Sequence, residues 1–255
     1  MFRNNLKVAL RSLLKQKAYT VINVLGLAVG IASCLVIVLF IRYEFSYDTF
    51  LRDYDRVYRM SLERIYPNHT TLYSVVPHSF ESVARRDFPE IELSCNVAGF
   101  PNFPLSYKNQ HDEIKQFDED FVVLTDSTFF KMFSFRLLRG EADEVFRNPN
   151  DIVLTEEMAH RYFGTEDPIG KVLLSGDQPF KVTGVMENVP DNSHFKFNCL
   201  VSLRTFPFVR QENFTSFSTY TYFKLRSGAD PHGLEAKFPK MVDTYAAAQI
   251  ERELG

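Results

Sequence analysis

The sequence contains no tryptophan and only three cysteines among its 255 residues, and its six histidines are scattered. Zinc hydrolases and thiol oxidoreductases use the HExxH and CxxC motifs, and neither occurs. The GxSxG turn that presents a serine nucleophile is also missing. We therefore predict that the protein is not an enzyme, with no catalytic residue, no metal ligand and no bound cofactor.

Charge is missing from one long stretch. Residues 18–41 contain no charged side chain. At about 1.5 Å per residue they form a helix of roughly 36 Å, which crosses a hydrocarbon core of about 30 Å with some tilt. A signal peptide has an apolar core of only about 7–15 residues, and Arg42 to Phe45 offer no small-residue cleavage pattern. We predict an uncleaved transmembrane helix over 18–41.

Acidic residues are absent from residues 1–17, which carry five Lys or Arg side chains. Cytoplasmic flanks collect such cations, so the N-terminus is predicted to be inside and residues 42–255 outside. Removing these five cations from the formal net charge of −3 leaves −8 for residues 18–255. This acidic balance predicts no nucleic-acid partner, which would require a basic face.

Residues 1–17 also have the spacing of an amphipathic cytoplasmic helix. Apolar residues recur at intervals of four and three, and cations recur at intervals of four on a neighbouring face that can contact membrane lipids. The apolar residues are Phe2, Leu6, Leu10 and Leu13, and the cations are Lys7, Arg11 and Lys15. The spacing fits an ordinary basic flank equally well, and both interpretations stay open.

Small residues recur every four positions inside the predicted membrane helix, at Gly26, Gly30 and Cys34. Such a row lets a second helix approach closely, so we assign these three residues to helix packing. The other cysteines, Cys95 and Cys199, lie in the predicted outer domain, where the compartment permits a disulfide. The sequence leaves open whether they pair.

The outer region begins and ends with strand and helix patterns. A strand over 56–62, a helix over 77–88 and a strand over 91–98 indicate an α/β layer. A strand over 218–226 and a helix that starts at Asp230-Pro231 and runs to the end of the chain return to this pattern.

Residues 99–215 differ, because short strand-like runs and turn residues dominate them. Asp126 and Thr155 can cap two short helices there. The predicted fold class is α+β: the transmembrane helix is followed by an α/β domain, formed by 42–98 and 216–255, with a β-rich subdomain inserted at 99–215. The 25 phenylalanines are expected to build its core.

One segment imitates a phosphate-binding loop, from Gly164 to Lys171. A P-loop needs GxxxxGK followed by Ser or Thr. Here the two glycines are one residue too far apart, and Val172 replaces the hydroxyl that would hold Mg²⁺. We predict a turn before a strand and no nucleotide site.

Four groups of residues together resemble one family, in order and across nearly the whole chain. They are the opening up to Cys34; Tyr47-Asp48 with Arg56–Arg59; Asp87–Glu92; and Phe129–Phe135 with Leu138–Gly140, Ile152–Thr155, Phe163-Gly164, Pro168–Lys171 and Val182–Val185. They resemble the permease subunits of macrolide-exporter (MacB) and FtsX-type ABC transporters, most of all a long branch common in Bacteroidetes-like bacteria.

The resemblance implies a protein of the bacterial inner membrane with a MacB-like periplasmic core domain. It implies mechanotransmission: a separate cytoplasmic ABC ATPase hydrolyses ATP, and the permease couples this to export or to lipoprotein or peptide handling. The implied partners are that ATPase, a second permease copy in a homo- or heterodimer, membrane lipids, and a periplasmic adaptor or outer-membrane component. Family members continue into further membrane helices, so we expect this chain to be an N-terminal fragment with an incomplete periplasmic domain.

Two other functions stay open. A single-pass, membrane-anchored extracytoplasmic sensor or binding module has the same topology, but 17 inner residues cannot form a signalling domain. A membrane-tethered periplasmic enzyme is disfavoured by the missing motifs. The sequence does not indicate the transported substrate.

Overall fold

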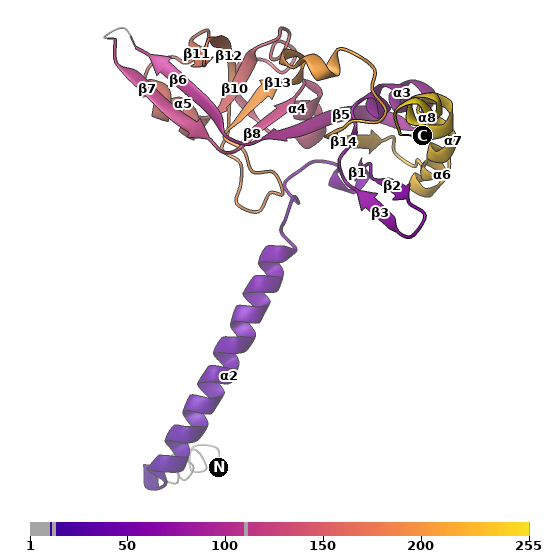
Figure 1. Cartoon of the computed structure of the whole chain (residues 1–255). Helices are drawn as coiled ribbons and strands as arrows, with labels where there is room; N and C mark the ends of the chain where they lie inside the picture. The colour runs from indigo at the N-terminus through magenta and orange to yellow at the C-terminus, as the bar shows by residue number, and fades with distance from the viewer. Residues whose placement is uncertain (1–10, 12–13, 110–111, 255) are drawn as a thin grey trace. The chain divides into compact units, whose positions relative to one another are not determined.

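The computed structural model describes residues 11, 14–109 and 112–254. The chain divides into two compact units, Met1–Thr49 and Phe50–Gly255. They are described separately below, with the element labels of Figure 1.

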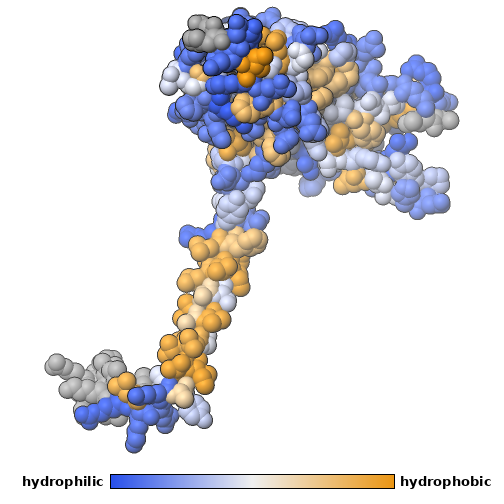
Figure 2. Space-filling model, turned by 60° about the vertical axis from the view of Figure 1, so that its left-hand side comes forward, coloured by the Kyte–Doolittle hydropathy of each residue, from blue (hydrophilic) through white to orange (hydrophobic). Residues whose placement is uncertain are grey.

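The first unit contains the long helix α2 (Lys17–Glu44). Its 28 residues correspond to about 42 Å, more than the hydrocarbon core of a bilayer requires. None of its side chains is buried, and its surface is largely hydrophobic in Figure 2. Within the described residues this is the one helix long and apolar enough to cross a membrane. The predicted membrane helix is confirmed as a helix and extends slightly beyond 18–41 at both ends.

The second unit is organised by a mixed sheet of 12 strands. The strands are β1 (Val57–Arg59), β4 (Val76–Pro77), β5 (Ile91–Phe100), β6 (Phe103–Lys108), β7 (Ile114–Glu119), β8 (Val122–Thr125), β9 (Leu137–Arg139), β10 (Asp151–Thr155), β11 (Val172–Ser175), β12 (Gln178–Met186), β13 (Cys199–Ser202) and β14 (Phe217–Leu225). A separate hairpin pairs β2 (Leu62–Ile65) with β3 (Thr70–Tyr73).

The strand order is β1-β14-β5-β8-β13-β10-β12-β11-β6-β7, with β4 beside β14 and β9 beside β12. The β8–β13 and β10–β12 pairs are parallel, and the other pairs are antiparallel. Non-neighbouring parts of the sequence therefore lie side by side in one sheet (Figure 1). One sheet runs through both the predicted α/β part and the predicted inserted β-rich part. The boundaries between these parts, at 98/99 and 215/216, stay a prediction.

Within the described part of the second unit, six helices accompany the sheet: α3 (Ser79–Asp87), α4 (Thr128–Phe133), α5 (Glu156–Phe163), α6 (Pro231–Glu235), α7 (Phe238–Tyr245) and α8 (Ala247–Leu254). Short 3₁₀ turns occupy Tyr54–Arg56, Leu203–Thr205 and Pro207–Val209. The Thr155 hydroxyl accepts a bond from the Met158 N–H at 3.3 Å, and the Asp230 carboxylate accepts one from the His232 N–H at 3.0 Å. Both predicted caps are confirmed.

The single helix predicted from residue 230 to the end of the chain is wrong, because three helices occur there. α6 ends at Glu235, and Pro239 lies in the first turn of α7. In a continuous helix the proline ring would clash with the carbonyl four residues earlier, which is that of Glu235. The clash explains why the chain begins a new helix at residue 238.

Strand β5 contributes to all three hydrophobic cores. Ile91 belongs to the core beneath α3 and α7. Cys95 and Val97 belong to a core with α4 on one face of the sheet, and Ala98 to a core with α5 on the other face. Successive residues of a strand point to opposite faces, which is how one strand serves two of these cores.

Cys95 and Cys199 do not form a disulfide. Cys95 lies in the core on the α4 face, whereas Cys199 lies in the core on the α5 face. The sheet separates the two thiols, and burial raises the pKa of each. The question that the sequence left open is thus answered by the alternation of side chains.

The α4-face core is built largely from phenylalanine, as predicted. The Phe129 ring lies 4.9 Å from Phe133, 5.4 Å from Phe135 and 5.3 Å from Phe195, measured between centroids. Phe129 has no exposed surface. Aromatic pairs at these distances add to the stabilisation from burial alone.

The carboxylate of Glu119 is also buried. Glu119 is only 1% exposed and accepts bonds from Arg161 at 2.5 Å, Tyr162 at 3.0 Å and the Asn198 amide at 3.1 Å. Three donors compensate for the loss of water around the charge. Glu119 therefore joins the end of β7 to α5 and to the start of β13.

We predict that Phe129→Ala destabilises the protein by about 3–5 kcal/mol, because it leaves a cavity in a closely packed aromatic core. The matched control is Phe121→Ala, since Phe121 is 54% exposed, and it should cost less than about 0.5 kcal/mol. The measurement is denaturant unfolding of the full chain in detergent, followed by near-ultraviolet circular dichroism. Equal losses in the two variants would contradict the assignment of Phe129 to the core.

Candidate functional site

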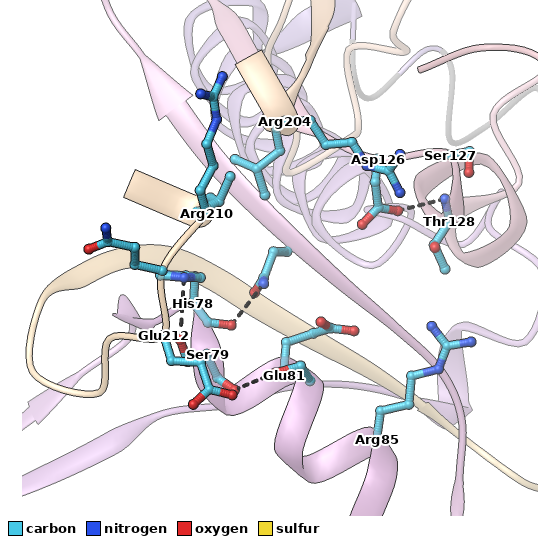
Figure 3. A pocket seen from close by; sticks show the side chains of 15 residues that line it. His78, Ser79, Glu81, Arg85, Asp126, Ser127, Thr128, Arg204, Arg210 and Glu212 are labelled. Atoms are coloured by element: carbon cyan, nitrogen blue, oxygen red, sulfur yellow. Dashed lines mark hydrogen bonds between the residues drawn. The ribbon is translucent and has the colours of Figure 1, made fainter. Parts of the chain in front are cut away.

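A polar cleft of about 440 Å³ lies between the start of α3, strand β5, the segment before α4 and residues 203–212. We call it the polar cleft. Figure 3 shows Arg85 on its α3 side and Arg204 and Arg210 across from it. Its walls come from four places far apart in the sequence, which the sheet brings together.

Asn96 supports the floor of the polar cleft from strand β5. Its amide donates to the His78 carbonyl at 3.0 Å, and its oxygen accepts from the hydroxyls of Thr219 at 3.1 Å and Thr221 at 2.7 Å. Asn96 is only 6% exposed, and a buried amide is stable only when it is hydrogen-bonded in this way. The network fixes the start of α3 against β14.

A serine and a histidine are adjacent in the polar cleft. The Ser79 hydroxyl lies 3.3 Å from Nε2 of His78, and it accepts a bond from the Asn213 N–H at 2.8 Å. Burial lowers the pKa of His78, against a smaller opposing effect of a hydrogen bond with the backbone of Gln211. Among the described residues, no carboxylate is hydrogen-bonded to His78, so the pair lacks the group that orients the histidine of a catalytic triad.

The charges around the polar cleft balance, since three arginines face three carboxylates. The cations are Arg85, Arg204 and Arg210, and the acids are Glu81, Asp126 and Glu212. The Asp126 carboxylate accepts a bond from the Thr128 N–H at 2.7 Å, but the cap position of α4 is occupied by Ser127, so the cap predicted at Asp126 is one residue too early. The described residues include no group of three or more His, Cys, Asp or Glu placed to hold a metal ion.

Glu81 is half-buried and accepts a hydrogen bond from the Ser94 hydroxyl. Burial raises the pKa of Glu81; the Ser94 bond opposes this rise, and the nearby charge of Asp126 adds to it. The polar cleft thus contains one carboxyl that is costly to ionise, among charges that otherwise compensate one another. This arrangement suits the binding of a polar group.

Comparison with known proteins identifies the family. Residues 20–240 match the MacB-like periplasmic core domain. The chain belongs to this family. Comparison with curated proteins gave no match.

Two solved structures share the fold of this MacB-like chain. One is a domain assigned to a permease protein from Porphyromonas gingivalis, with a TM-score of 0.70 and 20% identity over 80% of this chain and 87% of that one. The other is the periplasmic region of MacB from Actinobacillus actinomycetemcomitans, with a TM-score of 0.50 and 17% identity over 66% of this chain and 73% of that one. At these identities the likeness concerns the fold, and it confirms the predicted class of one apolar helix followed by a mixed domain.

The chain is therefore a membrane-anchored protein with the MacB-like periplasmic domain of an ABC-transporter permease. Permeases of the MacB and FtsX type work with a cytoplasmic ATPase as ABC transporters. The resemblance drawn from the ordered sequence motifs is confirmed by the family match.

The predicted helix-packing residues Gly26, Gly30 and Cys34 all lie on α2 and are exposed. A Cβ added at either glycine would meet nothing within 4 Å, so the row is open to another helix. Their packing role stays a prediction.

The predicted membrane-surface helix falls mostly outside the described residues, which include neither its apolar stripe nor its first cation (Phe2, Leu6, Leu10, Leu13 and Lys7). Arg11 and Lys15 are described: both have helical backbone and exposed side chains. A bend at Gln16 follows them and precedes α2. The contact of this segment with lipids stays a prediction.

The P-loop look-alike is a turn between α5 and β11, as predicted. Gly164 and Gly170 have φ angles of +62° and +82°, which favour glycine. The Gly170 N–H donates to the Val182 carbonyl at 2.8 Å. The Lys171 ammonium pairs with Glu166 and Tyr107, so it serves the turn itself.

Sequence reasoning missed the polar cleft. Its one available signal was the pair of polar residues, Ser94 and Asn96, inside the apolar strand predicted over 91–98. Both are buried, and each makes a hydrogen bond to α3 or to the residue before it. Polar residues in a buried strand indicate a network, but they do not identify its partners.

We predict that Glu81→Gln raises the melting temperature at pH 7.5 and leaves it unchanged at pH 4. A carboxyl whose folded-state pKa is raised contributes stability below its ordinary pKa of about 4.5, and this stability is lost as the pH rises through the folded-state value. Glutamine mimics the protonated form. Glu212→Gln, at an exposed carboxylate of the same cleft, is the control and should change neither value. A Glu81→Gln variant less stable at both pH values would contradict this account.

Proposed function

We propose that this chain forms part of a permease in the bacterial inner membrane, with its N-terminus in the cytoplasm and its main domain in the periplasm. ATP hydrolysis by a separate cytoplasmic ATPase moves the membrane helices, and the motion reaches the periplasmic domain. The domain then acts on an exported molecule, or on a lipoprotein or peptide. A second permease copy completes the assembly, and a periplasmic adaptor or outer-membrane component is a further partner.

The observation that carries this proposal is the continuity of the sheet through β5. Residues 91–97 of β5 pair with β14, and residues 98–100 pair with β8. The same strand packs into all three cores. Close-packed cores have low compressibility, so a displacement at one end of such a sheet carries the other end with it. A domain that transmits force requires this stiffness.

The orientation rests on charge and on helix length. The first 17 residues contain five cations and no acid, which favours the cytoplasmic side. α2 exposes apolar side chains such as Leu27 (65%) and Val29 (67%), which lipid or neighbouring helices would cover. Family membership supports a transport role in preference to a catalytic one.

A membrane-anchored binding module is the second candidate, and the polar cleft is the observation that favours it. A volume of about 440 Å³ is enough for a small polar ligand. The two candidates differ in whether the domain responds to ATP on the other side of the membrane.

We predict that ATP changes the distance between the periplasmic domains of two permease copies. Ile65, on the hairpin β2–β3, is 79% exposed and is a suitable site for a spin label as Ile65→Cys. Cys95 and Cys199 are buried and unreactive, and Cys34→Ser removes the remaining thiol. Pulsed dipolar spectroscopy on the permease–ATPase assembly should give one distance without nucleotide and another with ATP.

The control for this measurement is an ATPase whose P-loop lysine is replaced, so that nucleotide no longer binds productively. The distance should then stay at its nucleotide-free value. The same distance in every state would contradict mechanotransmission and favour the binding module. A sample without dipolar coupling would contradict the second copy.

We also predict that Gly26→Leu together with Gly30→Leu weakens assembly, because two leucines on this row prevent close approach of a second helix. Ala28→Leu together with Ala32→Leu is the matched control: each position is two residues further on, about 200° around the helix, and the change adds a similar bulk. Recovery of the permease–ATPase complex should fall at least about fivefold for the glycine pair only. Equal recovery of both variants would remove the packing role.

A further inference from the structure

A second hollow of the folded domain has a different character from the polar cleft. It has a volume of about 600 Å³ and lies between α4, the residues that follow it, the segment before β1, and β14. We call it the basic recess. Its cations are Arg52, Lys131, Arg136 and Lys224, and its one lining carboxylate is that of Asp53.

Two of these cations are already neutralised. Lys224 pairs with Asp53 at 2.6 Å, and Asp53 also pairs with Arg56 at 2.9 Å. Lys131 pairs with Asp143 at 2.7 Å. The single carboxylate of the recess is therefore fully engaged.

The other two cations, Arg52 and Arg136, are exposed. Among the described residues, neither guanidinium forms an ion pair or a side-chain hydrogen bond. The Glu187 carboxylate accepts from the Arg136 backbone N–H at 3.4 Å and not from the Arg136 side chain. The basic recess thus offers two free guanidinium groups.

The wall between these cations is apolar. Phe130 and Phe135 are 6% and 4% exposed, and Leu137 and Ala142 continue the same wall. An aromatic and aliphatic surface next to unpaired arginines matches an amphiphile with an anionic head, because the head pairs with the arginines and the adjoining carbons cover the apolar wall. A free phosphate ion would leave that wall uncovered.

A short segment of chain joins the basic recess to α2. Arg52 is eight residues beyond Glu44, the last residue of α2. A fully extended chain of this length spans at most about 29 Å. Exposed aromatic residues occupy the connection, with Tyr47 at 36% and Phe50 at 37%. Tyrosine favours the membrane interface. The Phe50 ring contacts Phe135 of the recess with centroids 5.7 Å apart.

We propose that the basic recess binds the phosphate headgroup of an anionic phospholipid from the leaflet that faces the domain. Arg52 and Arg136 bind the phosphate oxygens through their planar, forked donors, and the Phe130–Phe135 wall covers the glycerol and the first acyl carbons. This assignment rests on the proposed function only for the placement of the domain at the membrane surface. Such a contact would give the periplasmic domain a fixed point against which it moves.

The test titrates phosphatidylglycerol into the full chain in detergent micelles and counts the bound lipids by native mass spectrometry. Lipid around α2 gives a background common to all variants. Arg52→Gln together with Arg136→Gln should weaken the tightest phosphatidylglycerol site at least about tenfold. The matched control, Arg85→Gln with Arg210→Gln, removes two exposed arginines of the polar cleft and should leave that site unchanged. Melting temperatures confirm that both variants are folded.

Two further ligands identify the source of the phosphate. Phosphatidylcholine should bind more weakly than phosphatidylglycerol, because its choline cation offsets the phosphate charge, and inorganic phosphate at the same concentration should not displace phosphatidylglycerol. Equal lipid binding by the two double variants would overturn the proposal, and displacement by inorganic phosphate would reassign the recess to a soluble anion. Lipid binding in micelles needs neither ATP nor an ATPase. The lipid-binding proposal can therefore be wrong while the ATP-driven movement is confirmed, and the movement can be absent while lipid binding is confirmed.

Discussion

The domain depends on the pairing of strand β5 on both edges. Towards one end it bonds to β14 and packs beneath α3, and towards the other it bonds to β8 and contributes Ala98 to the core that includes α5. A strand in this position cannot shift its register by one residue without moving every side chain to the opposite face. Ile91, Val97 and Ala98 would then leave three different cores at once. The loss of burial in three cores therefore disfavours any other register of β5 and fixes the architecture of the MacB-like domain.

Buried polar side chains add specificity to the apolar cores. Asn96 connects β5 with the start of α3 and with two threonines of β14, and Glu119 connects β7 with α5 and the start of β13. Each is surrounded by donors or acceptors that satisfy it, so neither is left with an uncompensated loss of solvation. Both lie where a connection between separate segments is held.

The two hollows of the domain have complementary chemistry. The polar cleft joins α3 to residues 203–212 and balances three arginines with three carboxylates. The basic recess keeps two arginines free beside a phenylalanine wall, and one of them, Arg52, is eight residues beyond the end of α2. The two hollows therefore differ in net charge and in the ligands that they fit. Both hollows border α4, so a shift of this short helix would affect the two together.

The sequence by itself determined the features that depend on neighbouring residues. The unbroken apolarity of 18–41 predicts α2, and single residues such as Thr155 and Asp230 predict helix starts, because a cap acts within one turn. The ordered motifs predicted the family.

Strand β6 (Phe103–Lys108) was missed from the sequence, because Pro104 lowers its strand propensity. The strand forms by pairing with β7 and β11. Only the tertiary structure decided which polar residues meet. One cleft collects His78, Asn96, Asp126 and Arg204, and opposite faces of the sheet carry Cys95 and Cys199. Both arrangements result from pairing between strands that are far apart in the chain. No local sequence pattern encodes such pairing.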